Sequence, residues 1–123
     1  MNDRTSKLLL DAYIACGDMM SFVEGVTLRQ DEGSVLIRSG VERQVTIAAE
    51  ALAKAIEEDA SVEELIPEYH EVREMRNRLA HDYERTNHEV VWNAALNRAP
   101  DLRQRLGQIL TEAGWGHVLE TDS

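Results

Sequence analysis

The sequence predicts an all-α protein, a compact up-and-down bundle of four to five helices. Two observations support this fold class. Two prolines and seven glycines in 123 residues leave few helix breakers, and no segment alternates apolar and polar residues as a half-buried strand would. Apolar residues instead recur at steps of three and four, which places them on one face of a helix. We expect one helical domain over residues 1–115 and a flexible C-terminal tail over residues 116–123.

The first two expected helices have the clearest apolar stripes. A helix over residues 3–24 should end at Gly25, and a longer helix should cover residues 34–58. Gly40, inside the second helix, costs about 1 kcal/mol relative to alanine, which suggests a kink or a close helix contact there. The first stripe consists of Leu9, Tyr13, Cys16, Met20 and Val23, and the second of Val41, Val45, Ala48, Leu52 and Ala55.

The second half of the chain contains shorter expected helices. Ser61 and Glu64 have the spacing of a capping box, and Pro67 suits the first turn of a third helix over residues 68–86. A fourth helix is expected over residues 89–97. Pro100 either kinks it or opens a fifth segment, which Gly114 and Gly116 would end. The apolar face of that last segment is Leu102, Leu106, Ile109 and Ala113.

Composition excludes several classes of protein. The net charge of −10 argues against a general nucleic-acid coat protein and against a membrane-surface binder. No stretch approaches the roughly 20 apolar residues that cross a bilayer, so we expect no membrane partner. The single cysteine, Cys16, permits no internal disulfide and favours a reducing cytoplasm, with the thiol buried in a packing role.

The segment with the most chemistry is residues 76–83, which read RNRLAHDY. His81 can exchange a proton near neutral pH, and Arg76 presents charged donors that suit phosphate oxygens. Asn77 is four residues before His81, so its amide could hold the imidazole in one tautomer. These groups are a minimal set for cleaving a phosphodiester without a metal. From the residues alone, a solvated arginine and a structural histidine remain the commoner roles.

Helical geometry separates the two candidate catalytic groups. Arg76 and His81 are five residues apart, about 140° around a helix axis. Either the helix loosens near His81, or two chains supply the groups across a symmetric interface, and we favour the second arrangement. Residues 73–88 have a charge balance of +1 in an acidic chain. Such a basic island, to which Arg73, Arg78 and Arg85 contribute, can bind a short stretch of RNA.

At residues 76–83 the chain resembles HepT-type toxins of the HEPN superfamily, whose motif is Arg-x4-His-x-Tyr. The resemblance extends over about Leu8 to Leu110: the opening helix, the run over residues 45–51, Ile66-Pro67 before the motif and Val91-Trp92 after it follow the family's order. Relatives often have a glycine in the second helix, where this chain has the run IAAEA over residues 47–51.

The resemblance implies a metal-independent ribonuclease that acts as a homodimer and needs no cofactor. Arg76 and His81 would be the catalytic residues, with Asn77 the polar residue that commonly follows the motif arginine. The ribose 2′-hydroxyl would attack the adjacent phosphate, with His81 transferring a proton and Arg76 holding the phosphate oxygens. The strong acidity of the chain would reflect either docking to a basic antitoxin or a restriction of the RNA substrate to exposed ends or loops, such as those of tRNA.

The resemblance also implies regulation. Such toxins belong to HEPN/nucleotidyltransferase toxin–antitoxin systems of the type VII-like kind, in which a minimal nucleotidyltransferase antitoxin adenylylates a tyrosine, here Tyr83. Seven residues separate Tyr83 from Arg76, so both would share a helix face, and an anionic adenylyl group there would repel RNA.

Two alternatives to the ribonuclease remain open at this stage. One is a non-catalytic HEPN scaffold that binds nucleotide or the nucleotidyltransferase, and the other is a plain helical interaction domain with a fortuitous motif.

Overall fold

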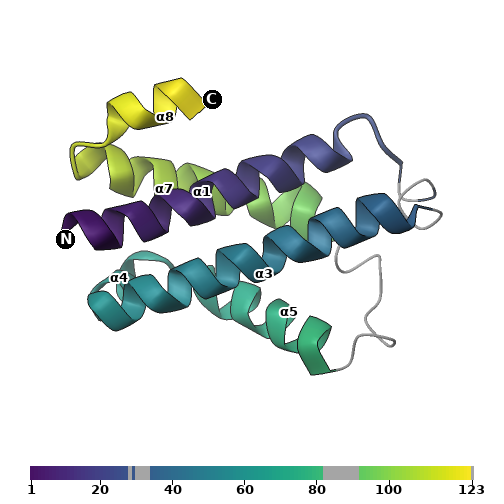
Figure 1. Ribbon diagram of the computed structural model, residues 1–123, viewed down its shortest axis with the longest axis horizontal. Helices are drawn as coiled ribbons and strands as arrows, with labels where there is room; N and C mark the ends of the chain where they lie inside the picture. Colours follow the sequence, from purple (N-terminus) through teal and green to yellow (C-terminus); the bar gives the residue numbers. More distant parts are fainter. Residues whose placement is uncertain (28, 30–33, 82–91, 123) are drawn as a thin grey trace.

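The computed structural model describes residues 1–27, 29, 34–81 and 92–122, and the elements in these ranges are helices (Figure 1). The all-α prediction is therefore confirmed for this part of the chain. The elements are α1 (Asp3–Val23), α3 (Val35–Glu58), α4 (Val62–Leu65), α5 (Tyr69–His81), the π-helical turn η2 (Ala94–Arg98), α7 (Ala99–Glu112) and α8 (Gly116–Asp122).

The long helices α1, α3, α5 and α7 run alternately up and down, as predicted (Figure 1). α1 packs against both α3 and α7, whereas α5 packs on α3. The C-terminal end of α5 diverges from the rest of the bundle (Figure 1).

Local capping explains where the two longest helices begin. The Asn2 Oδ1 accepts a hydrogen bond of 2.8 Å from the Thr5 amide, and the Ser34 Oγ accepts one of 3.1 Å from the Ile37 amide. Each cap satisfies a backbone donor that the first helical turn leaves unpaired. α1 ends just before Gly25, whose φ of 72° is readily adopted by glycine, so the predicted bounds of both helices are confirmed within a residue.

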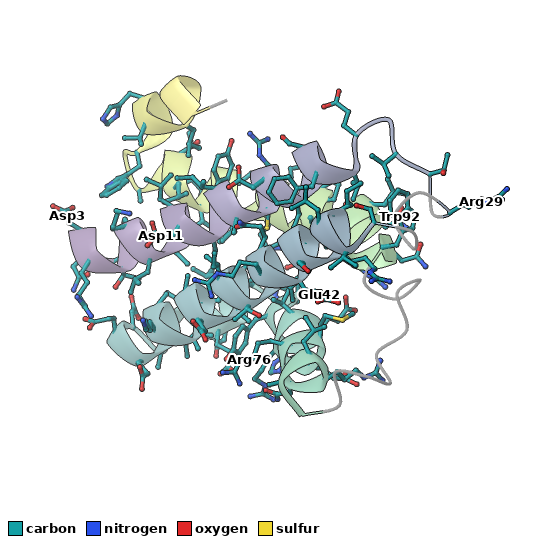
Figure 2. All side chains as sticks on the ribbon, turned by 45° about the vertical axis from the view of Figure 1, so that its right-hand side comes forward. Asp3, Asp11, Arg29, Glu42, Arg76 and Trp92 are labelled. Atoms are coloured by element: carbon teal, nitrogen blue, oxygen red, sulfur yellow. The ribbon has the colours of Figure 1, made fainter. Side chains whose placement is uncertain are left out.

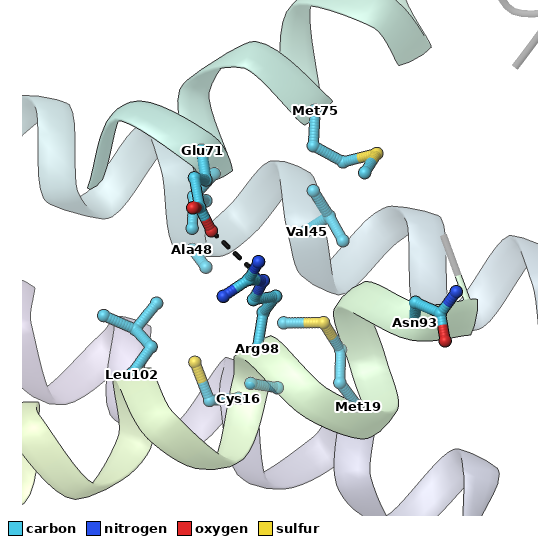
Figure 3. A pocket seen from close by; sticks show the side chains of 11 residues that line it. Cys16, Met19, Val45, Ala48, Glu71, Met75, Asn93, Arg98 and Leu102 are labelled. Carbon is cyan, nitrogen blue, oxygen red and sulfur yellow. Dashed lines mark ion pairs between the residues drawn. The ribbon is translucent and has the colours of Figure 1, made fainter. Parts of the chain in front are cut away.

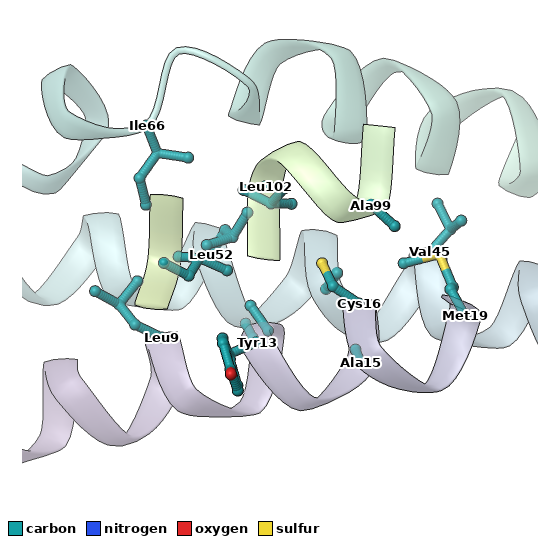
Figure 4. Packing of buried hydrophobic residues seen from close by; sticks show 14 of the residues in the cluster. Leu9, Tyr13, Ala15, Cys16, Met19, Val45, Leu52, Ile66, Ala99 and Leu102 are labelled. Carbon is teal, nitrogen blue, oxygen red and sulfur yellow. The ribbon is translucent and has the colours of Figure 1, made fainter. Parts of the chain in front are cut away.

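The apolar stripes form the core (Figure 4). Every stripe residue predicted on the first two helices is buried except Met20, which is partly buried; Met19 is buried beside it. Gly40 makes the close helix contact that the sequence suggests, because a Cβ added there would lie 3.1 Å from the Phe22 ring. Burial of a leucine such as Leu52, with none of its surface exposed, contributes roughly 2 kcal/mol.

The predicted capping box at Ser61 is wrong. Ser61 has helical backbone angles, φ −66° and ψ −19°, and its side chain caps nothing. Its hydroxyl instead donates to the Asp59 Oδ1 at 2.6 Å, and its amide donates to the same oxygen at 3.1 Å. The hydroxyl bond first, and then the amide bond, hold the pKa of Asp59 below its ordinary value. The serine therefore stabilises the turn before α4.

The two predicted alternatives for Pro100 are a kink and a new segment, and the structure has a helical backbone that continues from η2 into α7 without a break. Trp92 is buried, the π-helical turn η2 follows, and Pro100 lies in the first turn of α7. Leu102 and Leu106 are buried as predicted. The third buried residue of this face is Leu110, whereas Ala113, which was predicted to belong to the face, is exposed.

Residues 116–122 differ from the tail that the sequence suggests, because they form helix α8. Gly114 reverses the chain with a φ of 89°, and the Trp115 amide donates to the Leu110 carbonyl at 2.8 Å. Val118 and Leu119 then pack, partly buried, against the core. Packing of these two apolar side chains against the core stabilises the short helix.

Candidate active site on helix α5

Helix α5 carries the described part of the 76–83 motif. The chain enters it through buried Ile66 and a turn at Pro67, and the Tyr69 amide donates to the Ile66 carbonyl at 3.1 Å. Val72, Met75 and Leu79 then recur at helical spacing and are partly buried against the core. These three residues turn one face of α5 toward the core. The motif residues next to them in the sequence therefore lie at the edges of that face.

Arg76 lies between α5 and α3 (Figure 2). Its Nη2 is 3.6 Å from the Glu50 Oε1, on α3, and its Nη1 donates to the Asn77 Oδ1 at 3.4 Å. The Arg76 side chain is 37% exposed. The guanidinium therefore has a long hydrogen bond to Asn77 and an ion pair with Glu50, and it remains accessible to an anionic ligand.

The backbone of α5 places Arg76 and His81 on different sides of the helix. α5 is α-helical from Tyr69 to His81, so the loosening considered from the sequence does not occur between the two residues. Their Cα atoms are about 140° apart around the helix axis. Tyr83 and Arg85 lie outside the described residues.

The other arginines of α5 also have partners. The Arg78 Nη2 is 3.4 Å from the Glu74 Oε1, one helical turn earlier. The Arg73 guanidinium carbon lies 5.7 Å from the centre of the Tyr69 ring, within the range of a cation–π contact. The basic island on α5 is therefore partly neutralised by the helix itself, and a phosphate would compete with Glu74 for Arg78.

A cavity of about 290 Å³ lies beside the first half of α5, between α5, α3, α1 and the start of α7 (Figure 3). Its apolar lining includes Cys16, Met19, Val45, Val72, Met75 and Leu102. At the rim of the cavity, the Arg98 Nε is 3.2 Å from the Glu71 Oε2. This ion pair links α5 to the end of η2, directly before α7. Residues of α1, α3, α5 and α7 all line the cavity, and the ion pair between Arg98 and Glu71 bridges its rim.

Cys16 lines this cavity but has none of its surface exposed. Burial raises the pKa of its thiol to about 12, and the positive charge of Arg103 lowers it by less than burial raises it. The thiol is therefore protonated at neutral pH, and the predicted packing role of Cys16 is confirmed.

Two residues that matter at the site were not identified from the sequence. Glu50 lies in the run over residues 47–51, but only the packing of α3 against α5 reveals that it contacts Arg76. Glu71 likewise carries no sequence signal beyond its charge, because its partner Arg98 is distant in the chain.

In the described part of the chain, no three His, Cys, Asp or Glu side chains gather in a way that could hold a metal ion. No described helix is both long enough and apolar enough to cross a membrane.

Comparison with known proteins gives one family. The family model described as "Ribonuclease HepT-like" matches residues 13–109, which include α5 and the whole of the 76–83 motif. No match is found among curated proteins or among solved structures.

Proposed function

The chain belongs to the HepT-like ribonuclease family, and we propose that it is an endoribonuclease whose active site is built on Arg76 and His81 of α5. The observation that carries the proposal is the position of Arg76: within the family match, on the motif helix, with its guanidinium oriented by two acceptors yet accessible. An oriented, accessible arginine is suited to hold the oxygens of a phosphodiester.

The proposed reaction is a transesterification that needs no metal. The ribose 2′-oxygen forms a bond to the adjacent phosphorus as the bond from phosphorus to the 5′-oxygen breaks, which leaves a 2′,3′-cyclic phosphate and a 5′-hydroxyl. The 2′-hydroxyl loses a proton and the departing 5′-oxygen gains one; His81 carries out one of these two transfers, and solvent water carries out the other. Arg76 stabilises the charge on the non-bridging oxygens, and Asn77, through its bond to Arg76, helps to orient the guanidinium.

We propose that the active form is a homodimer. The regular helix between Arg76 and His81 favours a site in which one chain supplies the arginine and its partner supplies the histidine. A two-fold axis near α5 would create two such sites at once.

The proposed biological role is that of a toxin paired with a nucleotidyltransferase antitoxin that adenylylates Tyr83. An adenylyl phosphate near Arg76 would take the donors that RNA needs. We expect Tyr83→Phe to keep ribonuclease activity and to escape silencing, because it removes only the acceptor oxygen. Incubation with the antitoxin and ATP, followed by intact-mass and cleavage measurements, checks this; loss of activity in the adenylyl-free Phe variant would contradict it.

We propose exposed RNA loops or ends, such as those of tRNA, as substrates, with the cytoplasm as the site of action. The net charge of −10 disfavours long contacts with a duplex, since each added phosphate meets the negative field of the protein. A short, accessible strand can reach Arg76 with few additional contacts.

The experiment that tests the function is incubation of purified protein with total tRNA in EDTA. The variants are Arg76→Ala and His81→Ala, with exposed Arg43→Ala on α3 and exposed His70→Ala on α5 as matched controls. We expect cyclic-phosphate products from wild type and both controls, and none from the two motif variants. No cleavage by wild type confirmed by mass to lack an adenylyl group would overturn the proposal and favour the scaffold.

A further inference from the structure

Glu50 contacts the arginine of the proposed active site from a neighbouring helix. It reaches across from α3 to Arg76, at 3.6 Å between Oε1 and Nη2. We propose that Glu50 is a positioning residue that orients Arg76 for the phosphate, an inference that rests on the ribonuclease function proposed above.

The two contacts of Arg76 define the plane of its guanidinium. Nη2 is directed to Glu50 and Nη1 to Asn77, so the two terminal nitrogens are engaged from two different helices. A guanidinium is rigid and planar and carries five N–H donors. These two contacts therefore favour one orientation of the guanidinium, in which its remaining donors are accessible to phosphate oxygens.

Glu50 is presented from a well-packed helix. Its neighbours Ala49 and Ala51 are buried, at 4% and 7% exposure, and α3 packs against both α1 and α5. The Glu50 carboxylate is therefore presented to Arg76 from a helix that two neighbouring helices hold in place.

The ion pair does little for stability. Both side chains are substantially exposed, at 37% for Arg76 and 50% for Glu50, and exposed pairs contribute at most about 1 kcal/mol. The carboxylate also repels the phosphate that Arg76 must bind. The contact therefore weakens RNA binding slightly, and its benefit to the reaction is the orientation of Arg76.

This assignment predicts a separation of kcat from KM. Removal of the carboxylate in Glu50→Ala lets the guanidinium rotate. Because the contact contributes at most about 1 kcal/mol, kcat should fall by about two- to fivefold. KM for RNA does not rise, because a negative charge beside the phosphate is also lost. Glu50→Gln keeps an oxygen that can accept from Nη2, so its kcat should stay close to that of wild type.

The experiment measures kcat and KM on a short tRNA-loop oligonucleotide for wild type, Glu50→Ala, Glu50→Gln and the control Glu57→Ala. Glu57 is exposed on the same helix, two turns from Glu50, so its removal makes the same change in net charge. We expect Glu57→Ala to keep kcat. Thermal unfolding midpoints of all variants should stay close to wild type, which shows that the fold is intact.

Three results would overturn the inference: wild-type kcat in Glu50→Ala, the same kcat loss in Glu57→Ala, or a loss in Glu50→Gln as large as that in Glu50→Ala. If wild type cleaves no RNA, the proposed function fails, and the orientation of Arg76 is then tested directly by NMR. Hindered rotation of the Arg76 guanidinium should be present in wild type and Glu50→Gln and absent in Glu50→Ala. Free rotation in wild type would overturn the inference.

Discussion

At the scale of single residues, Cys16 illustrates how burial controls chemistry. Its pKa is raised from 9.0 to about 12, so the folded state keeps its proton where the unfolded state loses it. The contribution of the Cys16 thiol to the free energy of unfolding is therefore fully present below pH 9.0 and is lost as the pH rises toward 12. We expect the difference in unfolding free energy between wild type and Cys16→Ala to shrink by about 2 kcal/mol between about pH 8 and about pH 10.5.

Urea unfolding of both proteins at the two pH values measures this difference. A thiol reagent such as 5,5′-dithiobis(2-nitrobenzoate) at neutral pH gives a second readout, with no reaction in the folded protein and full reaction in urea. Rapid labelling of the folded protein would show instead that the cavity beside α5 admits reagents to the thiol.

The residues of the motif differ in how far the sequence alone could place them. The chemistry of Arg76 and Asn77 could be predicted from their identities and from the resemblance. Their contact with each other, and that of Arg76 with Glu50, could not, because rotamers depend on what packs nearby. The expected contact of Asn77 with the His81 ring and the placement of Tyr83 remain predictions.

At the scale of elements, the helices that local signals define could be predicted best. α1 and α3 have caps and continuous apolar stripes, and their bounds differ from the expected ones by a residue at most. The π-helical turn η2 and helix α8 could not be predicted. Both depend on tertiary packing, since η2 inserts before a proline and α8 forms by covering part of the core.

The anchoring of α5 is also tertiary. The Arg105 Nε on α7 lies 2.7 Å and 2.8 Å from the two carboxylate oxygens of Glu68, just before α5 begins. Glu68 is only 21% exposed and Arg105 41%, so this pair is less screened than the others near α5. It holds the N-terminal end of the motif helix, at the opposite end from His81.

We therefore expect Arg105→Ala to lower the free energy of unfolding by about 1 kcal/mol. The control is Arg4→Ala, whose partner is Glu58 and whose side chain is 68% exposed; it should change stability by less than about 0.5 kcal/mol. Chemical denaturation measures both values. Amide hydrogen exchange should speed up in α5 more than in α1, and equal effects across the protein would contradict a specific anchor for α5.

At the scale of the whole molecule, the proposed dimer makes a prediction about mixed variants. If one chain supplies Arg76 and its partner His81, a heterodimer of Arg76→Ala with His81→Ala keeps one complete site. Random mixing gives half heterodimers, so about a quarter of wild-type activity should return. The measurement is cleavage after the two inactive variants are unfolded together and refolded. Activity no higher than in either variant alone would favour a site within one chain.

The charge of the whole molecule sets the salt dependence of RNA binding. The chain carries a net charge of −10, and the arginines Arg76 and Arg78 already face the carboxylates of Glu50 and Glu74. Such a surface neutralises few phosphates. Each phosphate contact to a single strand contributes about −0.7 to the slope of log affinity against log salt concentration, so two or three contacts predict a slope of about −2.

Cleavage at salt concentrations from about 50 to about 200 mM, read as KM, measures this slope. Arg78→Ala should make it shallower by about 0.7, the contribution of one phosphate contact, while Arg4→Ala, at the Glu58 end of α3, should leave it unchanged. A slope steeper than about −4 would mean that RNA follows a longer basic path. In that case the acidic surface would not limit the enzyme to short, exposed strands, and the proposed preference for loops would have to rest on shape alone.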